Sequence, residues 1–264
     1  MAPDRQARLP LLFLLAHATG AAGRYAELLG GLSAKARLAP LDLPGHGSRR
    51  GERALSDMEG IREDLAVQAA AALRGDGSPE GPGAAPQARA ARPPEAPEGS
   101  AFPGYFVFGH SMGAVCGYVM TERLMALGYG PPRRFFASSF SVPGWHPIPP
   151  GMADLPDLQM WQESALRFGV LNGQPVPDPE RMETHSPVYR ADLRAVEGYR
   201  PGRLTVLPCP VTVFYAESDM VDGELAGRWR GLSARPPEIV RVPGGHFHPL
   251  ERPGQLEGLL LARL

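Results

Sequence analysis

Short apolar runs alternate with helical patterns along most of the chain. Glycine, proline and small polar residues bound the apolar runs, which is typical of buried strands. The predicted strands are 9–15, 38–43, 105–108, 134–138, 210–215 and 238–242. The predicted helices are 24–32, one beginning at Ser56 with Glu59 in a capping box, one ending near Gly128, 223–232 and 255–264. This alternation predicts an α/β fold with a doubly wound, mostly parallel sheet.

Two segments interrupt the alternation. Residues 75–101 consist mainly of Gly, Pro and Ala, so burial of apolar side chains cannot offset the entropy of ordering them. We predict a disordered insertion there, within a single domain that covers residues 1–264. Residues 139–205 lack strand patterns but contain helical pieces at 158–168 and 187–199. We predict that this second segment forms a lid over the carboxyl edge of the sheet.

Composition narrows the choice of partners. The 264 residues carry a net charge of −1, and 43% of them are hydrophobic. This balance gives no electrostatic case for nucleic acid or an anionic membrane, and we expect neither as a partner.

The two cysteines indicate the redox compartment. Cys116 and Cys209 lack metal-site spacing and are interpreted as reduced thiols of a cytoplasmic protein, with a disulfide as the alternative. We expect the protein to be a monomer. The apolar run 9–16 is interpreted as a core strand, with a signal peptide as the alternative.

The strongest chemical signal is the pentapeptide Gly109-His110-Ser111-Met112-Gly113, a G-x-S-x-G sequence. It lies between a predicted strand and a predicted helix, which is the context of a nucleophile elbow. We predict that Ser111 is the nucleophile and that the backbone N–H of Met112 contributes to an oxyanion hole. The alternative is a Gly/Ser turn without chemistry.

A serine nucleophile needs a base and an acid that orients it. His246 follows the strand 238–242 at the edge where open α/β sheets place functional groups, and His248 is the alternative base. Asp219 follows the strand 210–215 and is the predicted acid, with Asp222 and Glu217 behind it. Capping of the following helix is the other role open to Asp219.

The second oxyanion donor of such a site comes from the loop after the first strand. The backbone N–H of Ala18, in His17-Ala18-Thr19-Gly20, occupies that place.

Nearly the whole chain outside 75–101 resembles the stand-alone type II thioesterases of nonribosomal peptide and polyketide synthesis, members of the α/β-hydrolase superfamily. The resemblance rests on LAHATG, GHSMGA, LRFGVLNGQP followed by SPVYRADLRAVEGYR, CPVTVFYAESD and GGHF. The last two motifs contain Asp219 and His246. Within the lid motif, Arg190 and Asp192 are interpreted as a structural ion pair that holds the lid.

The resemblance implies hydrolysis of acyl thioesters on the phosphopantetheine arm of acyl or peptidyl carrier proteins. The biological role would be removal of aberrant or stalled acyl chains during antibiotic biosynthesis. Phosphopantetheine belongs to the carrier, so the resemblance implies no cofactor and no metal in this chain. Five apolar lid residues are candidates to line an acyl chamber: Met160, Trp161, Leu166, Phe168 and Val170. The alternatives are a small-molecule carboxylesterase or lipase of the same fold, and a binding protein without catalysis.

Overall fold

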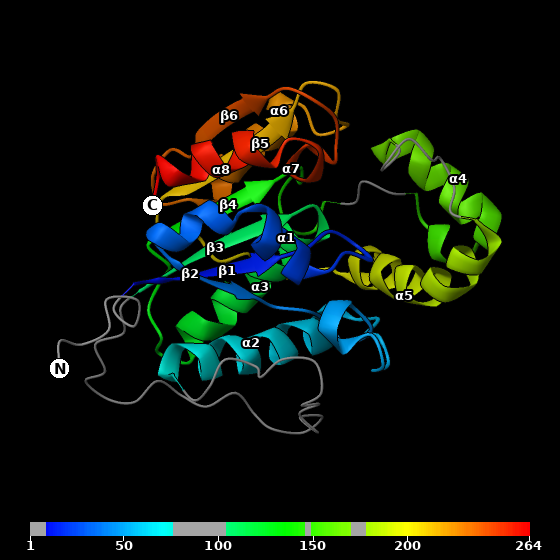
Figure 1. The fold of residues 1–264 in the computed structure, drawn as a ribbon, viewed down its shortest axis with the longest axis horizontal. Helices are drawn as coiled ribbons and strands as arrows, with labels where there is room; N and C mark the ends of the chain where they lie inside the picture. The colour runs from blue at the N-terminus through cyan, green and yellow to red at the C-terminus, as the bar shows by residue number, and fades with distance from the viewer. Residues whose placement is uncertain (1–8, 76–103, 146–148, 170–177) are drawn as a thin grey trace.

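The structure is a computed structural model that describes residues 9–75, 104–145, 149–169 and 178–264. The described strands form one six-stranded sheet in which every pairing is parallel, in the order β2-β1-β3-β4-β5-β6 (Figure 1). Their bounds are β1 Leu11–Leu15, β2 Arg37–Pro40, β3 Tyr105–His110, β4 Arg134–Ser138, β5 Val211–Ala216 and β6 Glu238–Val242. The six predicted apolar runs are therefore the six strands, and the predicted parallel sheet is confirmed.

The helices follow the strands in chain order. The α-helices are α1 Ala22–Leu28, α2 Met58–Arg74, α3 Met112–Ala126, α4 Asp157–Phe168, α5 Pro179–Gly198, α6 Gly223–Gly227, α7 His248–Glu251 and α8 Pro253–Leu261. The 3₁₀ turns are η2 Gly30–Ala34, η3 Gly47–Arg49, η4 Met152–Asp154 and η5 Arg228–Leu232. The predicted helices 24–32 and 223–232 are each split into an α-helix followed by a 3₁₀ turn.

Helices cover both faces of the sheet, as the side chains of β1 demonstrate. Leu11, Phe13 and Leu15 pack with residues of α2 and α3 on one face. Leu12 and Leu14 pack with residues of α1 and α8 on the other. A strand buried on both faces needs a continuous apolar run, which is why β1 has the sequence LLFLL. The doubly wound arrangement predicted from the alternation is confirmed.

The strand order places a switch point between β1 and β3. β2 pairs on one side of β1 and β3 pairs on the other, so the chain changes direction across the sheet after β2. Open α/β sheets bind ligands outside the carboxyl ends of the strands at such a point. The loop after β1 and the turn after β3 meet there.

Two helices begin at residues other than those predicted. The N-cap of α2 is Asp57 rather than Ser56, because the Asp57 carboxylate accepts a hydrogen bond of 2.7 Å from the N–H three residues on. α5 begins at Pro179, with Asp178 as its N-cap, whereas Pro187 lies inside the helix. Proline suits the first helical position, and Pro179 is the proline that occupies it.

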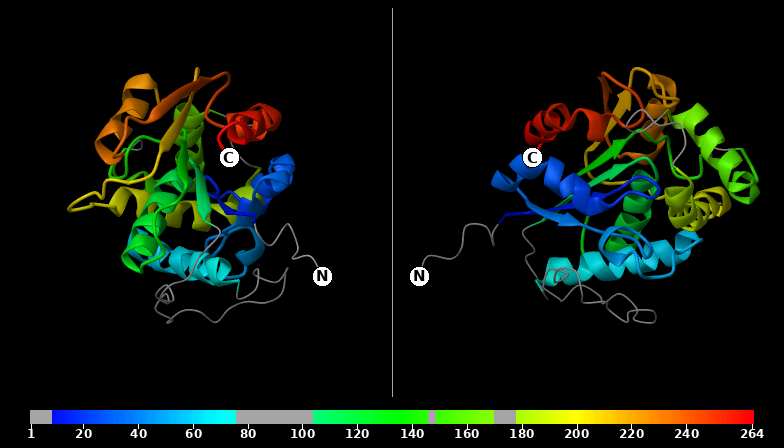
Figure 2. Two further views of the ribbon diagram at one scale, coloured as in Figure 1. Left: turned by 90° about the vertical axis from the view of Figure 1, so that its left-hand side faces the viewer. Right: turned by 45° about the vertical axis from the view of Figure 1, so that its right-hand side comes forward.

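The helices α4 and α5 form most of the described part of the segment 139–205. They lie beside each other outside the sheet, beyond the carboxyl end of β1 (Figures 1 and 2). They share an apolar cluster with η4 whose buried members are Met152, Ala153, Met160, Tyr189 and Leu193. Ala18, in the loop after β1, packs against this cluster and also against the main core. The α4–α5 pair therefore rests on that loop.

The predicted insertion 75–101 lies outside the described residues apart from Gly75. Gly75 has a φ of 75° and ends α2 in the left-handed conformation that glycine adopts without strain. The disordered insertion and the single domain stay predictions. Among the described residues, no helix combines the length and apolar character that crossing a bilayer requires.

Candidate active site

Ser111 lies at the tip of a strained turn between β3 and α3. Its φ of 53° and ψ of −125° are uncommon for a residue with a side chain, and its N–H donates to the Ser138 carbonyl oxygen at 2.8 Å. The flanking glycines permit this turn. A Cβ at Gly109 would lie 2.2 Å from the Gly113 carbonyl oxygen, and a Cβ at Gly113 would lie 2.4 Å from the Leu15 carbonyl oxygen. Side chains at these positions would separate β3, α3 and β1.

The structure brings Ser111, His246 and Asp219 together in a continuous chain of hydrogen bonds. His246 Nε2 lies 2.9 Å from Ser111 Oγ, and His246 Nδ1 lies 3.0 Å from Asp219 Oδ1. The side chains of His246 and Asp219 are 4% and 0% exposed. With the Nδ1 proton directed to the carboxylate, Nε2 is left as the acceptor of the serine proton.

Asp219 is suited to remain ionised in this position. Burial by itself raises the pKa of its carboxyl group, but the hydrogen bond and charge of His246, with contributions from Ser139 and the Met220 N–H, lower it below its ordinary value. The two alternative acids point elsewhere. Glu217 is directed at Arg241, 3.7 Å away on the surface.

Asp222 has the capping role that was the other interpretation of Asp219. Its Oδ1 accepts hydrogen bonds from the backbone N–H groups of Glu224 and Leu225, at 3.0 and 2.9 Å, and it is the N-cap of α6. Asp219 is therefore not needed as the cap of that helix.

Other histidine rings surround the site, and burial keeps them neutral. His248, the alternative base, places Nε2 3.0 Å from Ser138 Oγ rather than at Ser111. Burial lowers the pKa of His248 to about 4 and that of His17 to about 3. His110 is fully buried with a pKa well below 6.5, first because of burial and then because of its histidine neighbours. Its ring centroid lies 5.2 Å from that of His246.

The two predicted oxyanion donors lie at the switch point. Met112 is the first residue of α3, where the unpaired N–H groups and the helix dipole favour a negative charge. Within the described part of the chain, the Ala18 N–H donates no hydrogen bond, whereas its neighbours are engaged: Thr19 N–H with Asp192 and Gly20 N–H with the His17 carbonyl oxygen. Ala18 therefore has a free donor in a turn that is otherwise fixed.

Arg190 and Asp192 both hold the α4–α5 pair in place, but not by pairing with each other. Arg190 donates to the carbonyl oxygens of Ala153 and Leu155 and forms an ion pair with Asp157. Asp192 instead binds Thr19 and His46, as described below. The predicted ion pair between the two residues is wrong, because α5 directs Arg190 at α4 and η4, and Asp192 at the sheet.

The end of α4 reaches the site through Phe168, whose ring centroid lies 4.9 Å from that of His246. The other candidate chamber residues lie in different surroundings. Met160 is buried in the apolar cluster that α4 and α5 share with η4, and Trp161 stacks on Tyr189 at 4.5 Å. Leu166 is 81% exposed, and Val170 lies outside the described residues.

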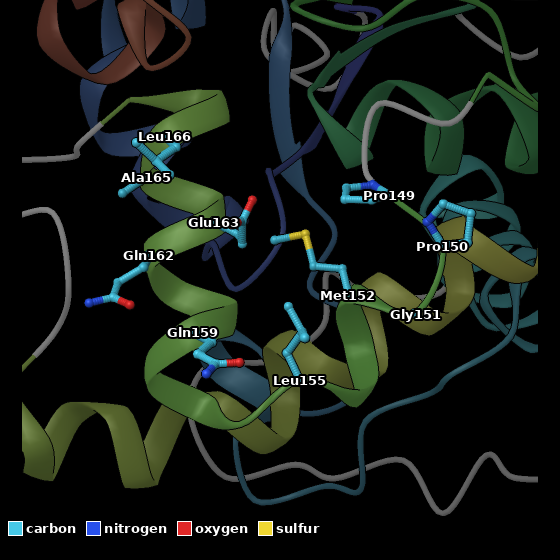
Figure 3. Close-up of a pocket in the computed structure, with 10 residues that line it drawn as sticks. All are labelled: Pro149, Pro150, Gly151, Met152, Leu155, Gln159, Gln162, Glu163, Ala165 and Leu166. Atoms are coloured by element: carbon cyan, nitrogen blue, oxygen red, sulfur yellow. The ribbon is translucent and has the colours of Figure 1, made fainter.

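A pocket of about 810 Å³ opens between α4 and η4. Figure 3 shows Met152 and Glu163 directed from opposite sides into the space between these elements. Its lining is Pro149, Pro150, Gly151, Met152, Leu155, Gln159, Gln162, Glu163, Ala165 and Leu166. Ser111, His246 and Asp219 are not among these residues.

The described residues contain no group of His, Cys, Asp or Glu side chains arranged to hold a metal ion. Cys116 and Cys209 are buried and free, with no disulfide between them. Burial raises the pKa of both thiols, that of Cys209 to about 11.

A sequence model of the Thioesterase domain matches residues 95–262, which is more than half of the chain. The chain belongs to the thioesterase family, and its sheet has the α/β-hydrolase fold of that family.

Curated relatives and solved structures agree with this assignment. The chain is 32% identical over 146 residues to the gramicidin S biosynthesis protein GrsT of Aneurinibacillus migulanus, covering 53% of this chain and 54% of GrsT. The chain thus spans about half the length of that relative. It is 25% identical over 252 residues to thioesterase TesA of Mycobacterium marinum, covering 93% and 87%.

Among solved structures, the chain is similar to RedJ, a thioesterase of the prodiginine pathway in Streptomyces coelicolor. The TM-score is 0.74 at 26% identity, covering 98% of this chain and 86% of RedJ. ClbQ of the colibactin pathway shares the fold at a TM-score of 0.76 and 20% identity. The resemblance to type II thioesterases of biosynthetic pathways is confirmed.

Proposed function

We propose that this protein is a serine thioesterase that hydrolyses acyl groups from the phosphopantetheine arms of acyl or peptidyl carrier proteins. The observation that carries the proposal is the chain of hydrogen bonds from Ser111 through His246 to Asp219 at the switch point of a thioesterase-family sheet. In this proposal these three residues are catalytic, and the Met112 and Ala18 N–H groups bind the oxyanion.

The chemistry follows from the positions of the donors and acceptors. Ser111 Oγ attacks the thioester carbonyl carbon while its proton passes to His246 Nε2. The carbonyl oxygen becomes an oxyanion that the N–H groups of Met112 and Ala18 stabilise. The C–S bond then breaks, and the leaving thiolate takes the proton from His246. Water, deprotonated by the same imidazole, then attacks the acyl–serine ester. The ester C–O bond breaks, Ser111 Oγ takes the proton back from His246, and the carboxylic acid is released.

A carrier-bound substrate fits the position of the α4–α5 pair. The phosphopantetheine arm must bring an acyl group to Ser111, and Phe168 of α4 lies against His246, where that arm would end. The surrounding α4–α5 pair offers contacts along the arm, remote from the reacting carbon. Such remote binding energy can be used to lower the barrier at the reacting centre. The biological role in this proposal is removal of aberrant or stalled acyl chains in the cytoplasm, as the resemblance to type II thioesterases implies.

The test compares one acyl group on two thiols. A carrier protein loaded with acetyl, propionyl or longer acyl phosphopantetheine is assayed beside the same acyl group on N-acetylcysteamine. We expect kcat/KM to be at least about 10²-fold higher on the carrier, because the short thiol lacks the remote contacts. Ser111→Ala is the blank for both substrates.

The second candidate is a small-molecule carboxylesterase of the same fold, since the triad geometry alone serves esters and thioesters equally. It predicts equal kcat/KM on both thiols and a higher value on simple esters. That result would reject carrier recognition while leaving a serine hydrolase.

A further inference from the structure

Asp192 connects α5 to the loops that follow β1 and β2. Its side chain is 1% exposed, and one oxygen, Oδ2, receives two hydrogen bonds. The Thr19 N–H donates to it at 2.8 Å, and His46 Nε2 lies 3.0 Å away. These partners are 173 and 146 residues distant in the chain. Burying a carboxylate with such partners costs desolvation free energy, which suggests that Asp192 has a role other than stabilising the fold.

The partners of His46 define the charge of this contact. His46 Nδ1 lies 3.0 Å from the Pro44 carbonyl oxygen, which only accepts hydrogen bonds, so Nδ1 carries a proton. His46 Nε2 faces Asp192 Oδ2, which already accepts from the Thr19 N–H, so Nε2 is the donor in this contact. Both ring nitrogens thus carry protons, and His46 is an imidazolium paired with a carboxylate.

The electrostatic surroundings agree with this assignment. Burial lowers the pKa of His46, but the hydrogen bond and charge of Asp192, the Pro44 carbonyl and the charge of Asp42 raise it above its ordinary value. Two further titratable groups near the pair are uncharged: His17 has a pKa of about 3, and burial raises the pKa of the Cys116 thiol.

The contact acts on the turn that carries the free Ala18 N–H. Thr19 has a φ of 63°, a left-handed conformation that a β-branched residue keeps only when its surroundings hold it. The turn is held at two points, by Gly20 N–H on the His17 carbonyl oxygen at 2.8 Å and by Thr19 N–H on Asp192. Without the second point, the strained residue beside Ala18 is free to relax.

We propose that Asp192 is a positioning residue, which holds the Thr19 N–H so that the neighbouring Ala18 N–H faces the oxyanion at Ser111. His46 holds the Asp192 carboxylate in place. Because Asp192 belongs to α5, the Ala18 N–H is fixed toward the oxyanion only when α5 packs against the loops after β1 and β2. The inference rests on the proposed function, because it assigns Asp192 a part in the same acyl transfer.

The experiment measures kcat, KM and the affinity for a trifluoromethyl ketone that forms a tetrahedral adduct with serine. Asp192→Ala removes the acceptor and should lower kcat and the affinity for the ketone together, on the order of 10²-fold, with KM changed less than about threefold. Asp192→Asn keeps an oxygen for Thr19 and should fall between wild type and Asp192→Ala in both quantities. This graded, parallel loss is what a purely structural role would not produce.

The matched control is Asp64→Asn. Asp64 forms a largely buried ion pair with Arg49 of η3, close in the chain to His46, without a hydrogen bond to the turn after β1. The control should lose stability but keep kcat and affinity for the ketone.

A second experiment measures kcat and KM as a function of pH. Wild-type kcat should fall as pH rises through the raised pKa of His46, while KM stays constant. This fall in kcat should be absent in His46→Gln.

The outcomes separate the two proposals. Wild-type kcat and ketone affinity in folded Asp192→Asn and Asp192→Ala would overturn the positioning role, even if Ser111→Ala is inactive. If Asp192→Ala does not fold, Asp192→Asn and His46→Gln decide in the same way. Full activity of Ser111→Ala would overturn the proposed function itself.

Discussion

The ring of Phe168 packs against the ring of His246, with their centroids 4.9 Å apart. Phe168 is the last residue of α4, so this helix touches the proposed base directly. We expect an acyl group bound to Ser111 to contact this ring. Phe168 is therefore placed to select among acyl groups.

Phe168→Ala should widen the space beside His246. We expect kcat/KM for a branched or long acyl thioester, relative to acetyl, to rise at least about tenfold, since a methylene or two in a pocket is worth that much. Leu166→Ala is the control, because Leu166 lies on the same helix and is 81% exposed. If the ratio of kcat/KM for the larger acyl group to that for acetyl were the same in both variants, Phe168 would not line the acyl site.

Asp219→Asn should lower kcat about 10⁴-fold with little change in KM, because an amide favours the wrong histidine tautomer. Asp222→Ala is the control. It removes the N-cap of α6 and should cost about 0.5–2 kcal/mol of stability while kcat stays at the wild-type value. Steady-state kinetics and urea unfolding of both variants check this. Equal losses of kcat in the two variants would contradict the role of Asp219 as the acid that orients His246.

Gly113→Ala should unfold the elbow. Its Cβ would lie 2.4 and 2.5 Å from the carbonyl oxygens of Leu15 and Ala16, and neither backbone atom can move without displacing β1. We expect a loss of at least about 3 kcal/mol in the free energy of unfolding. Gly258→Ala, in α8 with nothing within 4 Å of the new Cβ, should instead stabilise by about 0.5–1 kcal/mol. Similar values for the two variants in urea unfolding would contradict the close approach of α3 and β1.

Acid should destabilise the protein below pH 6.5. Burial lowers the pKa of His17 to about 3, of His248 to about 4 and of His110 well below 6.5. The unfolded chain therefore binds up to three more protons near pH 5, and the free energy of unfolding should fall by at most about 4 kcal/mol per pH unit. The lowered pKa of Asp219 has no effect in this window, because its contribution is lost only below about pH 4.

Urea unfolding at pH 7, 6 and 5 measures this slope. His248→Gln removes one of the three groups and should reduce the slope by about a third. An unfolding free energy that does not change between pH 6.5 and 5 would mean that these rings are charged in the folded protein.

The features that the sequence predicted are those with local signals. β1 could be predicted from its continuous apolar run, and the elbow from glycines two residues either side of Ser111. His246 and Asp219 could be selected because parallel strands end at one edge of the sheet, where the loops after β5 and β6 meet.

The features that were missed depend on contacts between distant segments. The Asp192–His46 pair spans 146 residues, and no local pattern distinguishes a buried carboxylate on α5 from an exposed one. The sequence prediction began the second helical piece of this segment at residue 187, whereas Asp178 and Pro179 form the start signal of α5. The arrangement of α4 against His246 through Phe168 likewise needs the folded chain.

The central claim is that Ser111 carries the acyl group taken from a carrier protein. Rapid-quench intact-mass spectrometry of the enzyme mixed with acyl carrier protein measures this directly. We predict a transient increase equal to the acyl mass, mapped by peptide analysis to Ser111 and absent from Ser111→Ala, with free carrier thiol released at the same rate. Steady hydrolysis without acylated Ser111, or undiminished turnover by Ser111→Ala, would contradict the account.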